Sequence, residues 1–133
     1  MKFALITLFS VFVALIAAVP VPRELEKRSS YHGRATWFSP ASEGGSTGAC
    51  GPQENDNSPI VALNHPQYGS MSSVSKWCGK KIRIKGPHGT AIARINDACP
   101  ECAYGSLDLT PAVFKKVVGN LNIGVGKITW SLA

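Results

Sequence analysis

Two aspartates on either side of a close pair of cysteines are the residues of this sequence best suited to chemistry. Asp97 follows an apolar run, Asp108 lies between two leucines, and Cys99 and Cys102 fall between the aspartates. A carboxyl group half-buried between leucines has its charged form disfavoured, which raises its pKa and suits it to proton donation. Asp108 is therefore the candidate acid.

Both aspartates also have a purely structural interpretation. Asp97 follows Asn96 at the end of a strand pattern, where its side chain could accept hydrogen bonds from turn amides. Asp108 could likewise bond to neighbouring backbone inside a crowded fold. From the residues alone, the functional and structural interpretations both stay open.

Alternating apolar and polar residues predict the strands that must position these side chains. Within 90–95, Ile92 and Arg94 share one face, and the pattern then breaks into a predicted polar turn at 96–97. The short run 107–109 places Asp108 on the face opposite its leucine neighbours. The other predicted strands are 34–38, 60–63, 80–85 and 127–132.

One helix is predicted over 111–118, where Thr110 can cap a first turn that begins with Pro111. A second short helix or turn is predicted at 65–68. The chain is therefore mainly β with one or two short helices. Trp130 alternates with Ile128 and Leu132, so we expect it in the core.

The first 28 residues have the features of secretory processing. Residues 1–18 combine Lys2, an apolar run and small residues, as in a signal peptide, and the run is shorter than the roughly 20 residues that span a bilayer. Residues 19–28 are polar and Pro-rich, and they end in Lys27-Arg28. That pair resembles a kexin-type processing site, although a charged linker could end the same way. We expect a secreted, single-domain mature chain over 29–133.

All four cysteines, Cys50, Cys78, Cys99 and Cys102, fall in the expected mature chain. An even number of cysteines in a secreted chain favours two disulfides, and a small domain gains from such bridges. Four cysteines allow three pairings, which the residues alone do not distinguish. A zinc site is the competing use of the Cys-x-x-Cys spacing, but the three histidines are scattered, so we expect no metal.

The expected mature chain has ten basic and six acidic residues, a net charge of +4. Lys81, Arg83 and Lys85 alternate with isoleucines, so one strand has a basic outer face. That face could meet an acidic polysaccharide, an anionic wall polymer or nucleic acid, or it could simply be a solvated face that discourages edge-to-edge pairing. Without a zinc finger or a basic-aromatic repeat, we expect no nucleic-acid partner.

Several motifs, in order along the chain, resemble the double-psi β-barrel of expansins, barwin-like proteins and rare lipoprotein A-like proteins. The core motif is I-N-D-A-C followed by L-D-L-T-P-A-V-F. The others are A-T-W-F at 35–38, T-G-A-C-G at 47–51, V-A-L-N at 61–64, W-C-G-K at 77–80 and I-T-W at 128–130. The resemblance covers nearly all of the chain from Arg34 onward and implies a six-stranded double-psi β-barrel.

The resemblance also implies a site and a disulfide pattern. The groove residues of the similar barrels correspond to Thr36, Asp97 and Asp108. Their disulfide pattern implies one bridge between Cys50 and Cys78 and a second between Cys99 and Cys102. Related family 45 endoglucanases take a second carboxylate from the first strand. Here that strand reads T-W-F-S and supplies no carboxylate, which counts against cellulase-type hydrolysis, although Asp97 could stand in as the base.

Aromatic side chains could add a sugar-binding platform, because flat rings match the apolar faces of pyranoses. The candidates are Trp37, Trp77 and Tyr104, although Trp77 adjoins Cys78 and could instead pack against that bridge. Together these features predict a secreted monomer that binds cellulose, chitin or peptidoglycan without hydrolysis.

Two alternatives belong to other classes. Similar single-domain barrels inhibit papain-like cysteine proteases, in which case exposed loops at 39–48 or 86–89 would act and the aspartates would be irrelevant. A weak lytic enzyme with Asp108 as its only acid is the other. Some relatives are labelled oxidative enzymes, but the sequence holds no flavin, nicotinamide or redox-metal fingerprint, so we expect no cofactor and no membrane partner after signal removal.

Overall fold

The structure, a computed structural model, describes residues 29–43 and 46–133. The expected signal peptide at 1–18 and the expected pro-segment at 19–28 lie outside the described residues. Within them, no helix is both long enough and apolar enough to cross a membrane.

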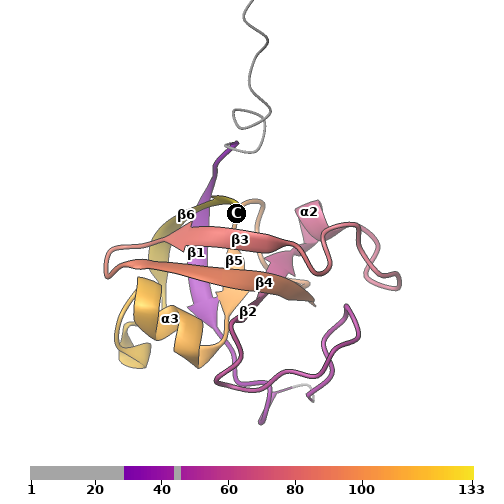
Figure 1. The fold of residues 1–133 in the computed structure, drawn as a ribbon, viewed down its shortest axis with the longest axis horizontal. Coiled ribbons are helices and arrows are strands. Elements are labelled where there is room, and N and C mark those ends of the chain that lie inside the picture. Colours follow the sequence, from indigo (N-terminus) through magenta and orange to yellow (C-terminus); the bar gives the residue numbers. More distant parts are fainter. Residues whose placement is uncertain (1–28, 44–45) are drawn as a thin grey trace, which may run out of the picture.

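Six strands close into a barrel in the order β1-β5-β2-β4-β3-β6 (Figure 1). Two pairings are parallel, β1 with β5 and β2 with β4, and the other four are antiparallel. This confirms the expected six-stranded double-psi β-barrel. The strands are β1 Tyr31–Trp37, β2 Ile60–Asn64, β3 Lys81–Lys85, β4 Thr90–Cys99, β5 Leu107–Leu109 and β6 Gly126–Leu132.

Three short helical segments connect the strands. The predicted helix is α3, Pro111–Val117, and the predicted turn at 65–68 is a short helix, α2, His65–Tyr68. A 3-10 turn at Leu121–Ile123 was not anticipated. In Figure 1, α3 lies on one side of the barrel beside the turn that joins β3 to β4. Its backbone carbonyl at Val117 accepts a hydrogen bond from the amide of His88 in that turn.

The strand periodicity accounts for the core. In β3, Ile82 and Ile84 are fully buried while the three basic residues beside them are exposed, as the alternation predicts. Trp130 is 2% exposed and donates from Nε1 to the carbonyl of Gly105, which confirms its expected core position. Because β3 is hydrogen-bonded to β4 on one side and β6 on the other, its basic face protects no free edge.

The predicted turn at 96–97 is wrong, because β4 continues through this polar stretch to Cys99. Its end pairs in parallel with β2, after a register shift between Val61 and Ala62. The buried Asn96 is satisfied by the loop that covers it, donating from Nδ2 to the Pro52 carbonyl at 3.0 Å. A polar residue can therefore stay in the strand when a distant loop supplies its hydrogen bonds.

The predicted side-chain cap of α3 is also wrong. Thr110 occupies the N-cap position, but its hydroxyl makes no capping hydrogen bond. It donates instead to the backbone carbonyl of Ser58 at 2.6 Å. The fully buried Thr110 thus ties the start of α3 to the residues before β2, a contact between segments about fifty residues apart.

Candidate functional site

The barrel register brings three predicted site residues into one row. Thr36 on β1 lies opposite Asp108 on β5, which lies opposite Ala62 on β2, which lies opposite Asp97 on β4. Directly opposite residues on neighbouring strands share a face. Since neighbouring strands are about 4.8 Å apart, the Cα atoms of the two aspartates are roughly 10 Å apart, with the small Ala62 side chain between them.

This row forms one wall of a groove of about 460 Å³. Both aspartates line the groove, whereas Thr36 reaches it only through its hydrogen bond to Asp108. Four of the residues that line the groove are acidic, which gives the groove a negative potential. The lining residues are Phe38, Glu43, Thr47, Ala62, Asp97, Ala98, Cys99, Pro100, Glu101 and Asp108.

Asp108 has the environment that the sequence suggested for a proton donor. Leu107 and Leu109 on either side of it are fully buried, and the Thr36 hydroxyl donates to its Oδ1 at 2.8 Å. Burial raises the pKa of Asp108 to about 6, the Thr36 hydrogen bond opposes this rise, and the charges of Glu43 and Asp97 add to it. The group therefore changes protonation in mildly acidic solution.

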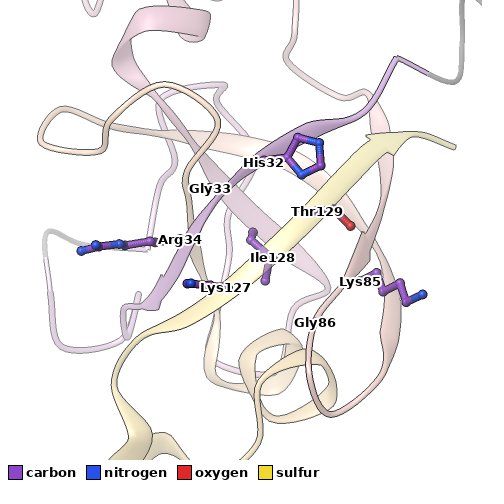
Figure 2. A pocket seen from close by; sticks show the side chains of 8 residues that line it. All are labelled: His32, Gly33, Arg34, Lys85, Gly86, Lys127, Ile128 and Thr129. Atoms are coloured by element: carbon purple, nitrogen blue, oxygen red, sulfur yellow. The ribbon is translucent and has the colours of Figure 1, made fainter.

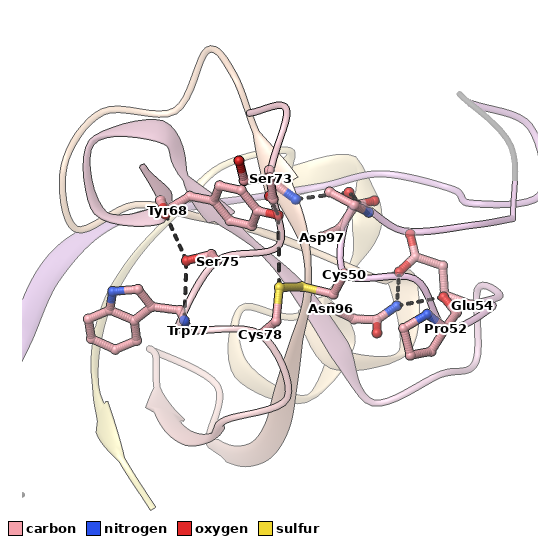
Figure 3. The surroundings of a disulfide bond; sticks show 12 residues. Cys50, Pro52, Glu54, Tyr68, Ser73, Ser75, Trp77, Cys78, Asn96 and Asp97 are labelled. Atoms are coloured by element: carbon pink, nitrogen blue, oxygen red, sulfur yellow. Dashed lines mark hydrogen bonds between the residues drawn. A yellow bond between two sulfur atoms is a disulfide. The ribbon is translucent and has the colours of Figure 1, made fainter. Parts of the chain in front are cut away.

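Asp97 is held by backbone amides. Its Oδ1 accepts hydrogen bonds from the N–H of Ala49 at 2.9 Å and from that of Ala98 at 2.8 Å. Figure 3 shows the side chain beside the segment that contains Cys50. Asp97 therefore ties the loop at 39–58, here called the covering loop, to β4. This agrees with the structural interpretation of Asp97, which also borders the groove.

Sequence reasoning missed Glu54, which lies next to this aspartate. Glu54 is 4% exposed, and its Oε2 accepts a hydrogen bond from Asn96 Nδ2 at 2.7 Å, while its buried Oε1 has no partner (Figure 3). Burial raises the pKa of Glu54 to about 7, the neighbouring Asp97 carboxyl group adds to this rise, and the hydrogen bond from Asn96 opposes it. Glu54 therefore keeps its proton to a higher pH than an exposed carboxyl group does.

A local signal for Glu54 existed in the sequence. The loop at 39–58 is long for a small domain, and such loops often carry function. Gly48 marks where the loop approaches β4, because a Cβ atom there would meet the Asn96 backbone carbonyl and lie 2.8 Å from Glu54 Oε2. Only glycine allows this approach without a shift of the loop.

Two disulfides frame the groove and confirm the pairing that the resemblance implied. Cys50 is bonded to Cys78, which joins the covering loop to the segment before β3 (Figure 3). Cys99 is bonded to Cys102, which closes the turn at the groove rim. Among the described side chains, no group of three or more His, Cys, Asp or Glu residues is arranged to hold a metal ion.

The predicted aromatic platform is divided between two places, and none of its three members lines the groove. Trp77 packs edge-to-face on Tyr31 and Trp130, with ring centroids 6.0 and 5.9 Å apart. Tyr104 is 62% exposed and also contacts Tyr31. Trp37 lies at the other end of β1, six residues and roughly 20 Å along the strand from Tyr31.

Trp37 has its own hydrogen bond and its own hollow. Its Nε1 donates to the carbonyl of Leu121 at 2.9 Å, and its ring borders a depression that Asp56 and Lys115 also line. Glu43 borders both this depression and the groove. Of the three aromatic residues, Trp37 is therefore the one next to the groove, and sugar stacking on any of them stays a prediction.

The closed barrel, its two parallel pairings and the Thr-Asp contact beside a carboxylate-lined groove define a double-psi β-barrel protein. No model of a defined protein family matches the chain. The crystal structure of the expansin of Clavibacter michiganensis is similar, with a TM-score of 0.64 and 30% identity, over 78% of this chain and 50% of that one. A variant of that expansin, with asparagine in place of an aspartate, was solved in complex with cellohexaose and matches equally well.

Two further proteins are informative. Expansin-YoaJ of Bacillus subtilis is 32% identical over 71 residues, which is 53% of this chain and 30% of that protein. A papain inhibitor of Streptomyces has a TM-score of 0.66 and 25% identity, over 78% of this chain and 94% of the inhibitor. These similarities support an expansin-like double-psi β-barrel family for the chain. It spans half or less of the length of the curated relatives it matches.

Proposed function

We propose that this protein is secreted and binds a strand of cell-wall polysaccharide in the groove between Asp97 and Asp108, without hydrolysing it. The observation that carries the proposal is the row Thr36-Asp108-Ala62-Asp97. The small Ala62 side chain leaves room for a sugar between the two carboxyl groups, and those carboxyl groups supply acceptors for the sugar hydroxyls. The cellohexaose complex of the similar expansin supports a glucan as the first ligand to test.

The proposed lack of hydrolysis rests on the partners of the two carboxyl groups. An inverting hydrolase needs an acid and a base, with room for a water on the opposite face of the sugar. Asp108 suits the acid, but β1 supplies Thr36 where the related endoglucanases have a base. Asp97 is committed to two backbone amides, which fix its carboxylate to the covering loop rather than leaving it to orient water.

The test is a pull-down of the secreted protein on insoluble cellulose, chitin and peptidoglycan, combined with a reducing-sugar assay. We compare the wild type with Asp108→Asn, which keeps an acceptor for Thr36 but removes the acidic proton. The matched control is Asp56→Asn, the same chemical change at a carboxylate that accepts from Ser39 outside the groove.

The expected result is binding to at least one polymer, no released sugar, and binding weakened several-fold in Asp108→Asn but not in the control. Ala62→Leu, which would fill the space between the aspartates, should abolish binding. Released sugar that disappears in Asp108→Asn would show instead a lytic or hydrolytic enzyme with Asp108 as its acid. Binding unaffected by both groove variants would place the glycan elsewhere on the barrel.

A second candidate function, inhibition of a papain-like cysteine protease, is favoured by one observation. The barrel is similar to 94% of the Streptomyces papain inhibitor, with a TM-score of 0.66, so the similarity includes nearly all of a protein that carries that name. Of the two loops predicted to act, 39–48 lies partly outside the described residues, and 86–89 is the turn between β3 and β4. Papain inhibition that survives Asp108→Asn and is lost on replacement of a loop would support this candidate over glycan binding.

A further inference from the structure

The outer face of four neighbouring strands, β4-β3-β6-β1, has a charge opposite to that of the groove. Its outward-facing residues are those that alternate with the buried core residues along each strand. Six of the ten basic residues in 29–133 lie there, and the one acidic residue of these strands, Asp97, lies near the end of β4, where it borders the groove instead. We call this surface the basic face; its cations are Arg34, Lys81, Arg83, Lys85, Arg94 and Lys127.

The strand register places like charges directly opposite each other on this face. Lys81 is paired with Arg94 across β3 and β4, and Arg34 is paired with Lys127 across β1 and β6. Like charges in such positions destabilise a sheet. No acidic side chain on the face offsets the repulsion, because all six acidic residues of the described chain lie in the groove region or in the loop that covers it.

A hollow of about 670 Å³ lies in the middle of the basic face. Figure 2 shows Arg34 and Lys127 on one side of β6 and Lys85 on the other, with Thr129 between them. His32 borders the same hollow and lies opposite Thr129 in the register. The hollow thus combines cations for carboxylates with a hydroxyl and an imidazole that can bond to sugar hydroxyls.

We propose that the basic face binds an acidic polysaccharide, a linear polymer with carboxylates on its sugar units. The charge is complementary, and a polymer that runs across the strands would meet several cations in succession. The groove itself repels such a polymer because four acidic residues line it. This proposal therefore concerns a different surface and a different ligand from the groove, and it does not rest on glycan binding there.

The features of the face favour a polysaccharide over nucleic acid or membrane. Single-stranded nucleic acids bind by stacking bases on aromatic rings, and no aromatic side chain is among the outward residues of these four strands in 29–133. Duplex DNA is read by elements that enter its grooves, whereas this face is a sheet surface. Insertion into a membrane needs an apolar surface, and Ile92 is the one large exposed hydrophobic residue on these outward positions.

The test measures binding of the secreted protein to polygalacturonate by affinity electrophoresis, at about 20 mM and about 500 mM salt. The face variant Arg83→Glu/Lys127→Glu reverses two exposed charges of the basic face. The control Lys76→Glu/Lys115→Glu makes the same change in net charge at two exposed positions outside the basic face. Circular dichroism and thermal unfolding establish that each variant is folded. If the face variant does not fold, Arg83→Gln/Lys127→Gln takes its place.

We expect the face variant to lose about tenfold or more in affinity at low salt, and the control to lose less than about twofold. High salt should abolish wild-type binding, and fully methyl-esterified polygalacturonate should not bind. Equal loss in both variants would show a response to net charge alone and would overturn the proposed face. Tighter binding to a DNA duplex than to polygalacturonate under the same conditions would overturn the proposed ligand. No binding at low salt would overturn both.

Discussion

On the β1-β5-β2-β4 side of the barrel, the two aspartates of the groove are partly buried and held by hydrogen bonds. On the β4-β3-β6-β1 side, the six cations are exposed, and four of them lie opposite a like charge on the neighbouring strand. The two sides therefore carry different free-energy costs. In the groove the cost comes from removing carboxylates from water, which depends on pH. On the basic face it comes from repulsion between exposed cations, which is small and depends on salt.

The difference also concerns what builds each surface. The basic face needs only the alternation within four strands. The groove needs a covering loop, and that loop is attached through the Cys50–Cys78 bridge, the Asp97 hydrogen bonds and the Asn96-Glu54 contact. Perturbations should therefore affect the two surfaces separately, and the predictions below run from the largest expected effect to the smallest.

Removal of the Cys50–Cys78 bridge should have the largest effect. Cys50→Ser/Cys78→Ser frees a loop with a sequence separation of 28 residues, and we expect a loss of roughly 3–4 kcal/mol in the free energy of unfolding. Cys99→Ser/Cys102→Ser opens a much shorter loop and should cost roughly half as much. Urea denaturation without reductant measures both losses.

The same bridge variant separates the two surfaces. Well below its melting temperature, it should lose glycan binding in the groove and keep binding to polygalacturonate. Loss of both activities in a folded variant would show that the groove and the basic face are not independent.

Glu54→Gln should remove a pH dependence of stability. The pKa of Glu54 is raised from 4.5 to about 7, so the folded protein holds this proton more tightly than the unfolded chain does. Its contribution to stability is therefore greatest below about pH 4.5 and is lost as pH rises to about 7. Above pH 7 the variant should be more stable than the wild type, on the order of 1–2 kcal/mol with allowance for solvent screening.

Melting temperatures measured at intervals from pH 4 to pH 8 test the Glu54 prediction. The wild type should lose stability across this window relative to the variant, and the two curves should converge at low pH. Parallel curves at all pH values would mean that the pKa of Glu54 is the same in the folded and unfolded protein. Glu101→Gln, the same change at an exposed position on the groove rim, is the matched control.

Asp108→Asn should act in the same direction over a lower range. The pKa of Asp108 is raised from 3.8 to about 6, so its contribution is greatest below about pH 3.8 and is lost as pH rises to about 6. We expect a gain on the order of 1 kcal/mol at pH 7 in the variant, because asparagine can still accept the Thr36 hydrogen bond. Thermal unfolding at pH 4 and pH 7 measures it, and a variant less stable than the wild type at pH 7 would contradict it.

The smallest expected effect is on the basic face. Lys81→Thr removes one member of the like-charged pair with Arg94 and should stabilise the sheet by about 0.2–0.5 kcal/mol at low salt. The gain should disappear at about 1 M salt, where charges are screened within a few ångströms. Lys76→Thr, outside the strands, is the control, and an equal gain there would assign the effect to net charge rather than to the cross-strand pair.

Much of the fold could be predicted because its signals are local. The isoleucines of β3 and the leucines beside Asp108 alternate with polar residues, and a period of two selects a strand with one buried face wherever it occurs. The pairing Cys50–Cys78 came from the resemblance, since four cysteines allow three pairings by themselves.

The errors share a physical origin. The polar pair at 96–97 looked like a turn, and Thr110 looked like a helix cap, because both have strong local preferences. In the folded chain, Asn96 bonds to Pro52 and Thr110 bonds to Ser58, and both partners lie more than forty residues away. Trp77 looked available for sugar, but it packs on Tyr31 and Trp130.

By itself, the sequence determined which residues face inward on most strands, that Asp97 and Asp108 lie in or next to strands, and that one strand has a basic face. Each of these features depends only on neighbours within a few positions along the chain. Only the tertiary structure decided that Asp97 and Asp108 share one row, that Glu54 is buried beside them, and that six cations gather on one face. Those arrangements depend on the register between strands far apart in the chain, and the register is set by closure of the barrel rather than by any local pattern.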